Sequence, residues 1–333
     1  MKGKQGMVCM GLLLVLSSCH TGKQITASGL QRKDFQTEVN GQHTDLFTLS
    51  NKQGMEVCIT NYGARVVSIL VPDRNGKRED VVCGFSTITE YMEQRQNFGS
   101  TVGRYIGRIL NARFTLDGVE YKLVPNNGKS GHISHGGNPG FADRIWKVEQ
   151  ADTHRVCLSY LSPDGENGFP GNLKVTLVYS LGEDDNALDL TYEATTDAPT
   201  VLNLSHHSFF NISGNFTKSV EDQQLWVDAD RFTPYDDKKC VTGEYLPVAG
   251  TPLDFRMPHA IGECIDADHP QLKVVNGYDH TWELNTKGDD TRPAAWVYDP
   301  ASGRKMEIFT TEPGMQIYTG NGLKGKMTGK GGM

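Results

Sequence analysis

Histidines occur in two glycine-rich, polar segments whose side chains could move protons near neutral pH. His132 and His135 lie in the first segment, and His206 and His207 are adjacent in the second. An imidazole exchanges its proton close to pH 7, so these residues suit general acid–base catalysis. Imidazole pairs also bind zinc, but no HExxH motif and no HxH with a suitably placed glutamate occurs, which argues against a metal site. A structural, hydrogen-bonded role stays an alternative for each histidine.

Three further polar side chains are expected at the ends of short strands. Arg108 follows an alternation of apolar residues, Asp254 comes just after a proline turn, and Gln316 lies in an alternating segment near the C-terminus. Paired donors and acceptors of this kind suit a neutral, polyhydroxylated ligand such as a sugar. Taken singly, each is equally compatible with an ordinary solvated surface residue.

Composition limits the classes of protein to be considered. The chain has 333 residues, of which 37% are hydrophobic, enough for a large core. Lys and Arg number 33 against 40 Asp and Glu, a net charge of −7, so no basic excess exists to hold nucleic acid. No GxGxxG or Walker loop follows a strand, and nucleotide cofactors are not indicated.

Period-two alternation between turn signals predicts antiparallel strands. The Asp117-Gly118 turn is typical of a tight hairpin over residues 112–123, with Phe114 opposite Tyr121. A second pair is expected between residues 173–179 and 188–192. Alternation over residues 310–321 predicts that Gln316 and Tyr318 face away from Met315 and Ile317.

Helical signals are few. A capping box at Thr87–Glu90 predicts one helix of two or three turns, and no long strand–helix alternation occurs. The expected fold class is therefore all-β: one large antiparallel β-sandwich with a few short helices.

The N-terminus has the pattern of an export signal. Two lysines precede a short apolar run, and residues 16–19 (Leu-Ser-Ser-Cys) are similar to a bacterial lipobox. We expect a signal peptide over residues 1–18, lipid attachment at Cys19, a polar tether over residues 19–33 and the folded domain over residues 34–333. This arrangement predicts an exported, membrane-anchored lipoprotein, periplasmic or on the cell surface. An ordinary signal peptide is the alternative, and the five cysteines beyond Cys19 show no disulfide framework.

Six ordered motifs between Phe35 and Lys326 resemble the aldose 1-epimerase (galactose mutarotase) family. In order along the chain, they are GRYIGRI (103–109), HGG with GFADRIW (135–146), NLSHHSFFN (203–211), TPLDFR (251–256), GYDH (277–280) and PGMQIYTGN (313–321).

The resemblance implies a β-supersandwich that interconverts the α and β anomers of free hexoses such as glucose or galactose, without metal or cofactor. By motif, His207 matches the general acid. Arg108 and His135 match the pair that contacts sugar oxygens, Asp254 the carboxylate that binds ring hydroxyls, and Gln316 an amide of the sugar site. The expected partner is a free monosaccharide.

Three departures from the family pattern stand out. Gly107 and His206 occupy positions where the family commonly has asparagine, so His206 is expected to lie around the substrate or to have a structural role. The family's general base, a glutamate in a Leu-Glu-Thr-Gln-like strand, has no match in this sequence. We therefore expect a copy that lacks C-terminal strands and itself shows little catalysis. The alternatives are a non-catalytic carbohydrate-binding lipoprotein and a metallohydrolase built on the four histidines above.

Overall fold

The computed structural model describes residues 24–323, 325 and 327–332. The predicted signal peptide and Cys19 lie outside the described residues. Among the residues described, no helix is long and apolar enough to cross a membrane. Residues 24–33, predicted to be part of a tether, pack against the domain. Leu30 is buried beside Phe35, and the Ala27 amide donates to a Glu56 carboxylate oxygen at 2.7 Å. The apolar Leu30 explains this docking, so the packed chain begins before residue 34.

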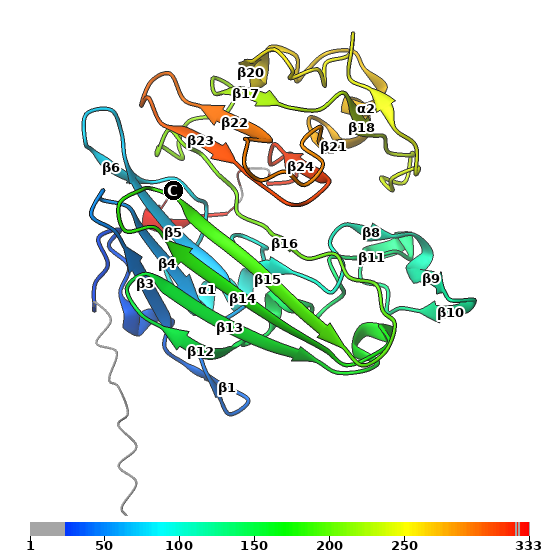
Figure 1. Ribbon diagram of the computed structural model, residues 1–333, viewed down its shortest axis with the longest axis horizontal. Helices are drawn as coiled ribbons and strands as arrows, with labels where there is room; N and C mark the ends of the chain where they lie inside the picture. The colour runs from blue at the N-terminus through cyan, green and yellow to red at the C-terminus, as the bar shows by residue number, and fades with distance from the viewer. Residues whose placement is uncertain (1–23, 324, 326, 333) are drawn as a thin grey trace, which may run out of the picture.

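Two four-stranded antiparallel sheets form the first sandwich (Figure 1). Their strands, in spatial order, are β3 (Leu46–Ser50), β4 (Glu56–Thr60), β5 (Arg65–Pro72) and β6 (Arg78–Asp80), and β12 (Lys147–Ala151), β13 (Arg155–Ser162), β14 (Leu173–Leu181) and β15 (Leu188–Thr196).

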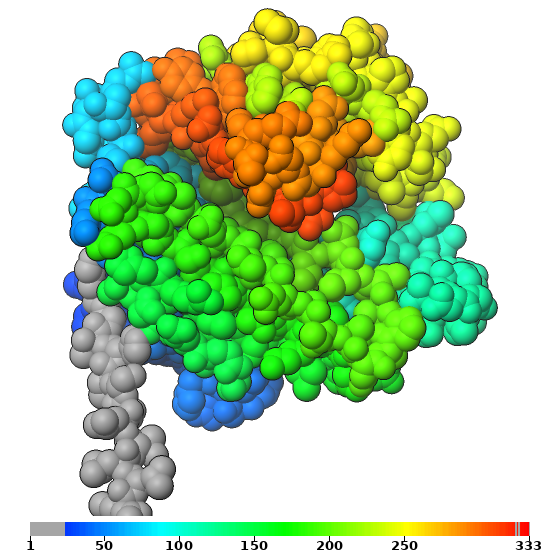
Figure 2. Space-filling view, in the orientation of Figure 1, coloured from blue at the N-terminus to red at the C-terminus, as the bar shows by residue number. Residues whose placement is uncertain are grey.

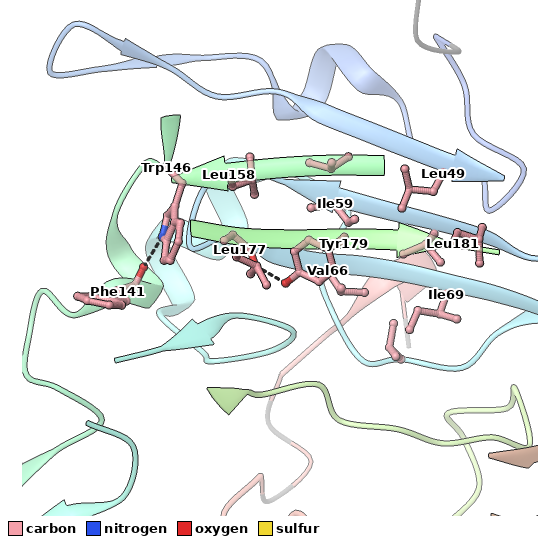
Figure 3. Close-up of a cluster of buried hydrophobic side chains, with 14 of the residues drawn as sticks. Leu49, Ile59, Val66, Ile69, Phe141, Trp146, Leu158, Leu177, Tyr179 and Leu181 are labelled. Carbon is pink, nitrogen blue, oxygen red and sulfur yellow. Dashed lines mark hydrogen bonds between the residues drawn. The ribbon is translucent and has the colours of Figure 1, made fainter. Parts of the chain in front are cut away.

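The core of this sandwich follows directly from alternation in β14. Leu177, Tyr179 and their alternate neighbours point inward against Ile59 and Val66 of the facing sheet (Figure 3). The Tyr179 hydroxyl donates to the Ala64 carbonyl at 2.7 Å, so its buried polar atom is satisfied. Strand β5 is buried on both faces along most of its length, because a further apolar cluster covers its other side.

Two more four-stranded sheets pack on each other above the first sandwich (Figure 1). In spatial order they are β20 (His259–Ala260), β17 (Gln224–Val227), β22 (Ala295–Tyr298) and β23 (Lys305–Ile308), and β19 (Leu246–Pro247), β18 (Arg231–Thr233), β21 (Asp279–Glu283) and β24 (Gly314–Tyr318). Met315 and Ile317 pack against the core between these sheets, as the alternation predicts.

Four two-stranded sheets and short helices complete the described chain. The pairs are β1 (Glu38–Val39) with β2 (Gln42–His43), β7 (Thr101–Val102) with β16 (Ser205–His206), β8 (Arg108–Ile109) with β11 (Ile133–Ser134), and β9 (Arg113–Leu116) with β10 (Val119–Lys122). The α-helices are α1 (Ile88–Gln94) and α2 (Pro270–Val275); the 3-10 helices are η1 (Arg32–Phe35), η2 (Leu110–Ala112), η3 (Gly128–Ser130), η4 (Phe141–Asp143), η5 (Glu166–Gly168), η6 (Ile261–Glu263) and η7 (Lys330–Gly332).

The local predictions are confirmed. Phe114 lies opposite Tyr121 across a turn in which Asp117 has φ 51°, the left-handed region that this turn requires. Strands β14 and β15 form the expected pair, in a register that sets Leu177 opposite Tyr192. Helix α1 begins at the predicted capping box on Thr87, and the five cysteines of the described chain are free. The all-β class with few short helices is thus confirmed.

Candidate active site

His207 lies directly after β16, where its backbone is held on both sides. Its amide donates to the Ser100 carbonyl, and its carbonyl accepts from the Gly99 amide, both at 2.9 Å. The imidazole stacks on Phe209 with ring centroids 5.0 Å apart and meets His135 edge-on at 5.5 Å. The side chain is half-buried, outside the packed interior. Burial lowers the pKa of His207, and the Arg65 guanidinium lowers it further.

His135 is presented by a tight loop after β11. Its φ is 54°, and at the next residue, Gly136, a Cβ would lie 1.9 Å from the Gly103 carbonyl oxygen, so only glycine fits there. The Gly107 amide donates to His135 Nδ1 at 3.3 Å. Burial, with His207 and Arg108 nearby, lowers the pKa of His135 to about 3. The ring is therefore neutral at pH 7, with its proton on Nε2 as a hydrogen-bond donor.

Arg108 lies at the start of β8, paired with Ser134 of β11. One Nη1 donor bonds to the Lys239 carbonyl at 3.0 Å. Its charge lowers the pKa of His135 and that of Asp279, in each case after the larger effect of burial. Figure 2 shows the teal surface around β8 and β11 adjoining the yellow surface of the upper sheets. A pocket of about 260 Å³ lies there, lined by Tyr105, Arg108, Ile109, Leu110, Phe114, Val201, Cys240 and Val241.

Gln316 on β24 faces a carboxylate on the neighbouring strand β21. Its Nε2 donates to Asp279 Oδ1 at 2.7 Å and to the Tyr235 hydroxyl at 3.2 Å, and its Oε1 accepts from the Thr281 hydroxyl. Burial raises the pKa of Asp279, while Gln316 and Arg108 lower it. Asp279, which lies in the GYDH motif but was given no role by the sequence analysis, thus joins Gln316 and Arg108. The sequence signal for Asp279 was the period-two alternation of the two strands. Their pairing places Asp279 directly opposite Tyr318.

Tyr318 of β24 links this group of residues to His207 through Phe209. Its ring meets the ring of Phe209 at 5.6 Å, and Phe209 is the residue on which His207 stacks. Asp279 also raises the pKa of Tyr318, after the larger effect of burial. We name the five side chains His135, His207, Arg108, Asp279 and Gln316 the histidine cluster. The structure therefore brings together four of the five site residues that the sequence analysis expects, and adds Asp279.

Asp254 is the exception. Its carboxylate accepts from Arg256 Nε at 2.9 Å and from Arg256 Nη2 at 2.8 Å, and Arg256 also bonds to Asp230. Arg256 lowers the pKa of Asp254. This pair lines a separate pocket of about 440 Å³, the Asp254 pocket, formed by Gly250, Thr251, Asp254, Arg256, Met257 and His259. Because Leu253 and Phe255 are buried in the upper core, Asp254 between them points away from it, and the structure does not bring it to the histidine cluster.

The two remaining histidines of the motifs have structural partners. His206 bonds through Nε2 to the Ser208 hydroxyl at 2.6 Å, and burial lowers its pKa to about 3. His132 is buried and accepts from the Asn111 amide at 3.0 Å. Over the described residues, no group of three or more His, Cys, Asp or Glu side chains could hold a metal ion. Neither histidine therefore supports the metallohydrolase alternative.

A family model described as aldose 1-epimerase matches residues 45–333. Galactose mutarotase from Sus scrofa is 39% identical over 286 residues, which cover 86% of this chain and 80% of the relative. Aldose 1-epimerase from Escherichia coli (strain K12) is 36% identical over 86% of this chain and 81% of its own length.

Two solved structures share the fold. A GalM/aldose epimerase homologue from C. elegans superposes with a TM-score of 0.79 at 30% identity, covering 87% of this chain and 85% of that one. Galactose 1-epimerase from Lactobacillus acidophilus NCFM gives a TM-score of 0.76 at 30% identity, over 86% and 81% of the two chains. The family match over most of the length, together with the histidine cluster, shows that this chain belongs to the aldose 1-epimerase family.

Proposed function

We propose that the protein interconverts the α and β anomers of free aldoses by opening and reclosing the sugar ring. The observation that carries the proposal is the placement of His207. Its imidazole is half-buried and fixed by the Phe209 ring, and it lies beside further sugar-binding groups of the histidine cluster. The names of the relatives support the same reaction.

Ring opening needs an acid at the endocyclic oxygen and a base at the C1 hydroxyl. His207 is the acid. Burial lowers its pKa, which makes its imidazolium form a stronger proton donor to the ring oxygen. The aldehyde end then rotates about C1–C2, and reclosure from the other face returns the proton to His207.

The rest of the cluster holds the sugar. His135 is neutral and offers Nε2–H to a sugar oxygen, and Arg108 offers charged donors. Asp279 and Gln316, already linked at 2.7 Å, present an acceptor and donor pair to neighbouring hydroxyls. This set suits a neutral polyol, because the one cationic side chain in it is Arg108.

The general base of the family, a glutamate, has no match in this sequence. Losing one acid or base costs about 10²–10⁴-fold in rate. We therefore expect the rate of ring opening to depend on His207 by a factor of that order.

Polarimetry on freshly dissolved α-glucose or α-galactose tests this function. The 333-residue protein should accelerate mutarotation above the spontaneous rate, and His207→Gln should remove the acceleration. Calorimetric binding of sugar with no acceleration would instead support the non-catalytic carbohydrate-binding alternative. If the protein shows no sugar binding and no acceleration, both the epimerase function and the carbohydrate-binding alternative are refuted.

The site of action is a separate proposal, based on the N-terminal motif alone. We infer that the protein is exported and anchored by lipid on Cys19, since residues 16–19 are similar to a lipobox after a short apolar run. Expression in a bacterial host followed by membrane fractionation tests it. The wild-type protein should sediment with membranes and carry a lipid mass on Cys19, and Cys19→Ser should not. A soluble wild-type protein without that mass would contradict the anchor.

A further inference from the structure

Arg65, the first residue of β5, is the largest charged side chain buried next to the histidine cluster. The residue is 1% exposed. In the part of the chain that the structure describes, no salt bridge joins it to a carboxylate, whereas the half-buried Arg144 pairs with Glu166. A buried charge without an ionic partner is costly, so its retention calls for a reason.

The Arg65 guanidinium donates hydrogen bonds to backbone carbonyls of separate segments. Nη1 donates to Gln96 at 2.8 Å and to Phe98 at 2.7 Å, and Nη2 donates to Ala142 at 3.0 Å. The cation also lies 4.6 Å from the centroid of the Tyr91 ring. Arg65 therefore ties β5 to the 96–98 segment and to η4, which follows the His135 loop.

The 96–98 segment leads to the histidine cluster within a few residues. Phe98 is followed by Gly99 and Ser100, the two residues that hold the His207 backbone. The Phe98 ring packs edge-on against Phe209 at 5.0 Å, and Phe209 is the ring on which His207 stacks. A shift of the 96–98 segment would thus move His207 through both its backbone and its ring.

We propose that Arg65 is a positioning residue for the epimerase reaction: its buried guanidinium, forked across Gln96, Phe98 and Ala142, holds the His207 imidazole in place for proton transfer. The proposal rests on the function proposed above. It does not make Arg65 a catalytic residue, since nothing places it in contact with a sugar.

Electrostatics support the same role. Burial is the main cause of the lowered pKa of His207; a hydrogen bond to its own backbone opposes it, and the charge of Arg65 lowers it further. The other groups that face His207 are the His135 edge and the Phe209 ring, with His206 as its chain neighbour. His135 is itself neutral at pH 7, as is His206. Loss of the guanidinium should therefore raise the pKa of His207 toward its ordinary value.

The decisive test follows the His207 ring by NMR in protein labelled with ¹⁵N-histidine, with the His207 signal assigned from His207→Gln. Arg65→Met removes both the charge and the forked hydrogen bonds to the three carbonyls. Arg65→Lys keeps the charge but cannot form the forked hydrogen bonds. We expect the pKa of His207 to rise in Arg65→Met and to stay low in Arg65→Lys. In polarimetry, kcat should fall about 10²-fold in both, with little change in KM, because the acid is misplaced while the sugar contacts remain.

Arg304 supplies a control for the loss of a buried arginine, although it also pairs with Glu79 at 3.4 Å. It is likewise buried and donates to backbone carbonyls, including Ser213 at 2.9 Å and Lys77 at 3.1 Å, but these belong to a different part of the molecule. Arg304→Met should destabilise the protein without moving the His207 titration.

An unchanged His207 titration in folded Arg65→Met, or an equal shift in Arg304→Met, would overturn the proposal. If Arg65→Met does not fold, Arg65→Lys is the deciding variant. A wild-type kcat together with unchanged His207 chemical shifts in that variant would also overturn the proposal. The titration needs no sugar and no turnover. A protein that fails the mutarotation assay but shows the shift would therefore contradict the proposed function and not the role of Arg65.

Discussion

The histidine cluster and the Asp254 pocket are built from similar residues and differ in how their charges are used. In the Asp254 pocket, the carboxylate and Arg256 bond to each other twice, and Asp230 takes a further donor. In the histidine cluster, Asp279 bonds to the neutral amide of Gln316, and Arg108 bonds to a backbone carbonyl. The pKa of Asp254 is lowered by its partner, whereas that of Asp279 is raised by burial. Two charged groups that pair with each other have little hydrogen-bonding capacity left for a ligand. Charged groups that bond to neutral partners keep the capacity to bind one.

The largest effect should come from the acid. His207→Gln keeps a polar side chain of similar reach but cannot donate as an imidazolium, so the mutarotation rate should fall about 10²–10⁴-fold with sugar affinity little changed. Polarimetry and calorimetry on the same preparation check both parts. A variant that keeps the wild-type rate would remove His207 from the chemistry.

The next effect separates the two carboxylates by binding. Asp279→Asn should weaken sugar binding by about 1.5–3 kcal/mol, the usual value of a hydrogen bond to a charged group, which is roughly ten- to a hundred-fold in Kd. Isothermal titration with galactose measures it. Unchanged affinity would show that Asp279 does not contact the sugar.

Acid should destabilise the protein through its buried histidines. The pKa values of His135 and His206 are about 3 in the folded protein against 6.5 as the ordinary value. Between these limits the unfolded chain binds protons that the folded one does not, so stability falls as the pH falls below about 6.5. Each such group contributes about 1.4 kcal/mol per pH unit.

His206→Asn should therefore reduce the loss of stability between pH 7 and pH 5, measured by urea unfolding at both values. Asparagine retains a partner for Ser208 and does not titrate. If the variant loses as much stability as the wild type over this interval, His206 is not among the groups that resist protonation.

The smallest effect is expected in the Asp254 pocket. Asp254→Asn removes one partner of a half-exposed ion pair, and such pairs contribute little. Sugar affinity and mutarotation should change less than about two-fold, within the scatter of surface substitutions. A large loss of affinity here, with none in Asp279→Asn, would reverse the assignment of the two carboxylates.

These two aspartates also show how far the sequence leads. Local patterns predict the β9–β10 hairpin, the pairing of β14 with β15 and the capping box, because each depends on residues close in the chain. Motif resemblance identifies His207, Arg108, His135 and Gln316 for the same reason: each lies in a short segment with a distinctive pattern.

Asp279 lies in one of the motifs, but its role escapes that approach, because its contact with Gln316 depends on the pairing of β21 with β24, almost forty residues later in the chain. For Asp254, the motif alone does not reveal which face its turn presents. The burial of Leu253 and Phe255, which settles that question, follows from packing between sheets. Arg65 is likewise invisible as a site residue, since its carbonyl partners come from two distant segments.

The crystal structure of the protein with galactose tests the central claim most directly. We predict a single sugar held by Arg108, His135, Asp279 and Gln316, with its ring oxygen within hydrogen-bonding distance of the His207 imidazole. A sugar seated instead against Asp254 and Arg256, with the histidine cluster unoccupied, would contradict the account.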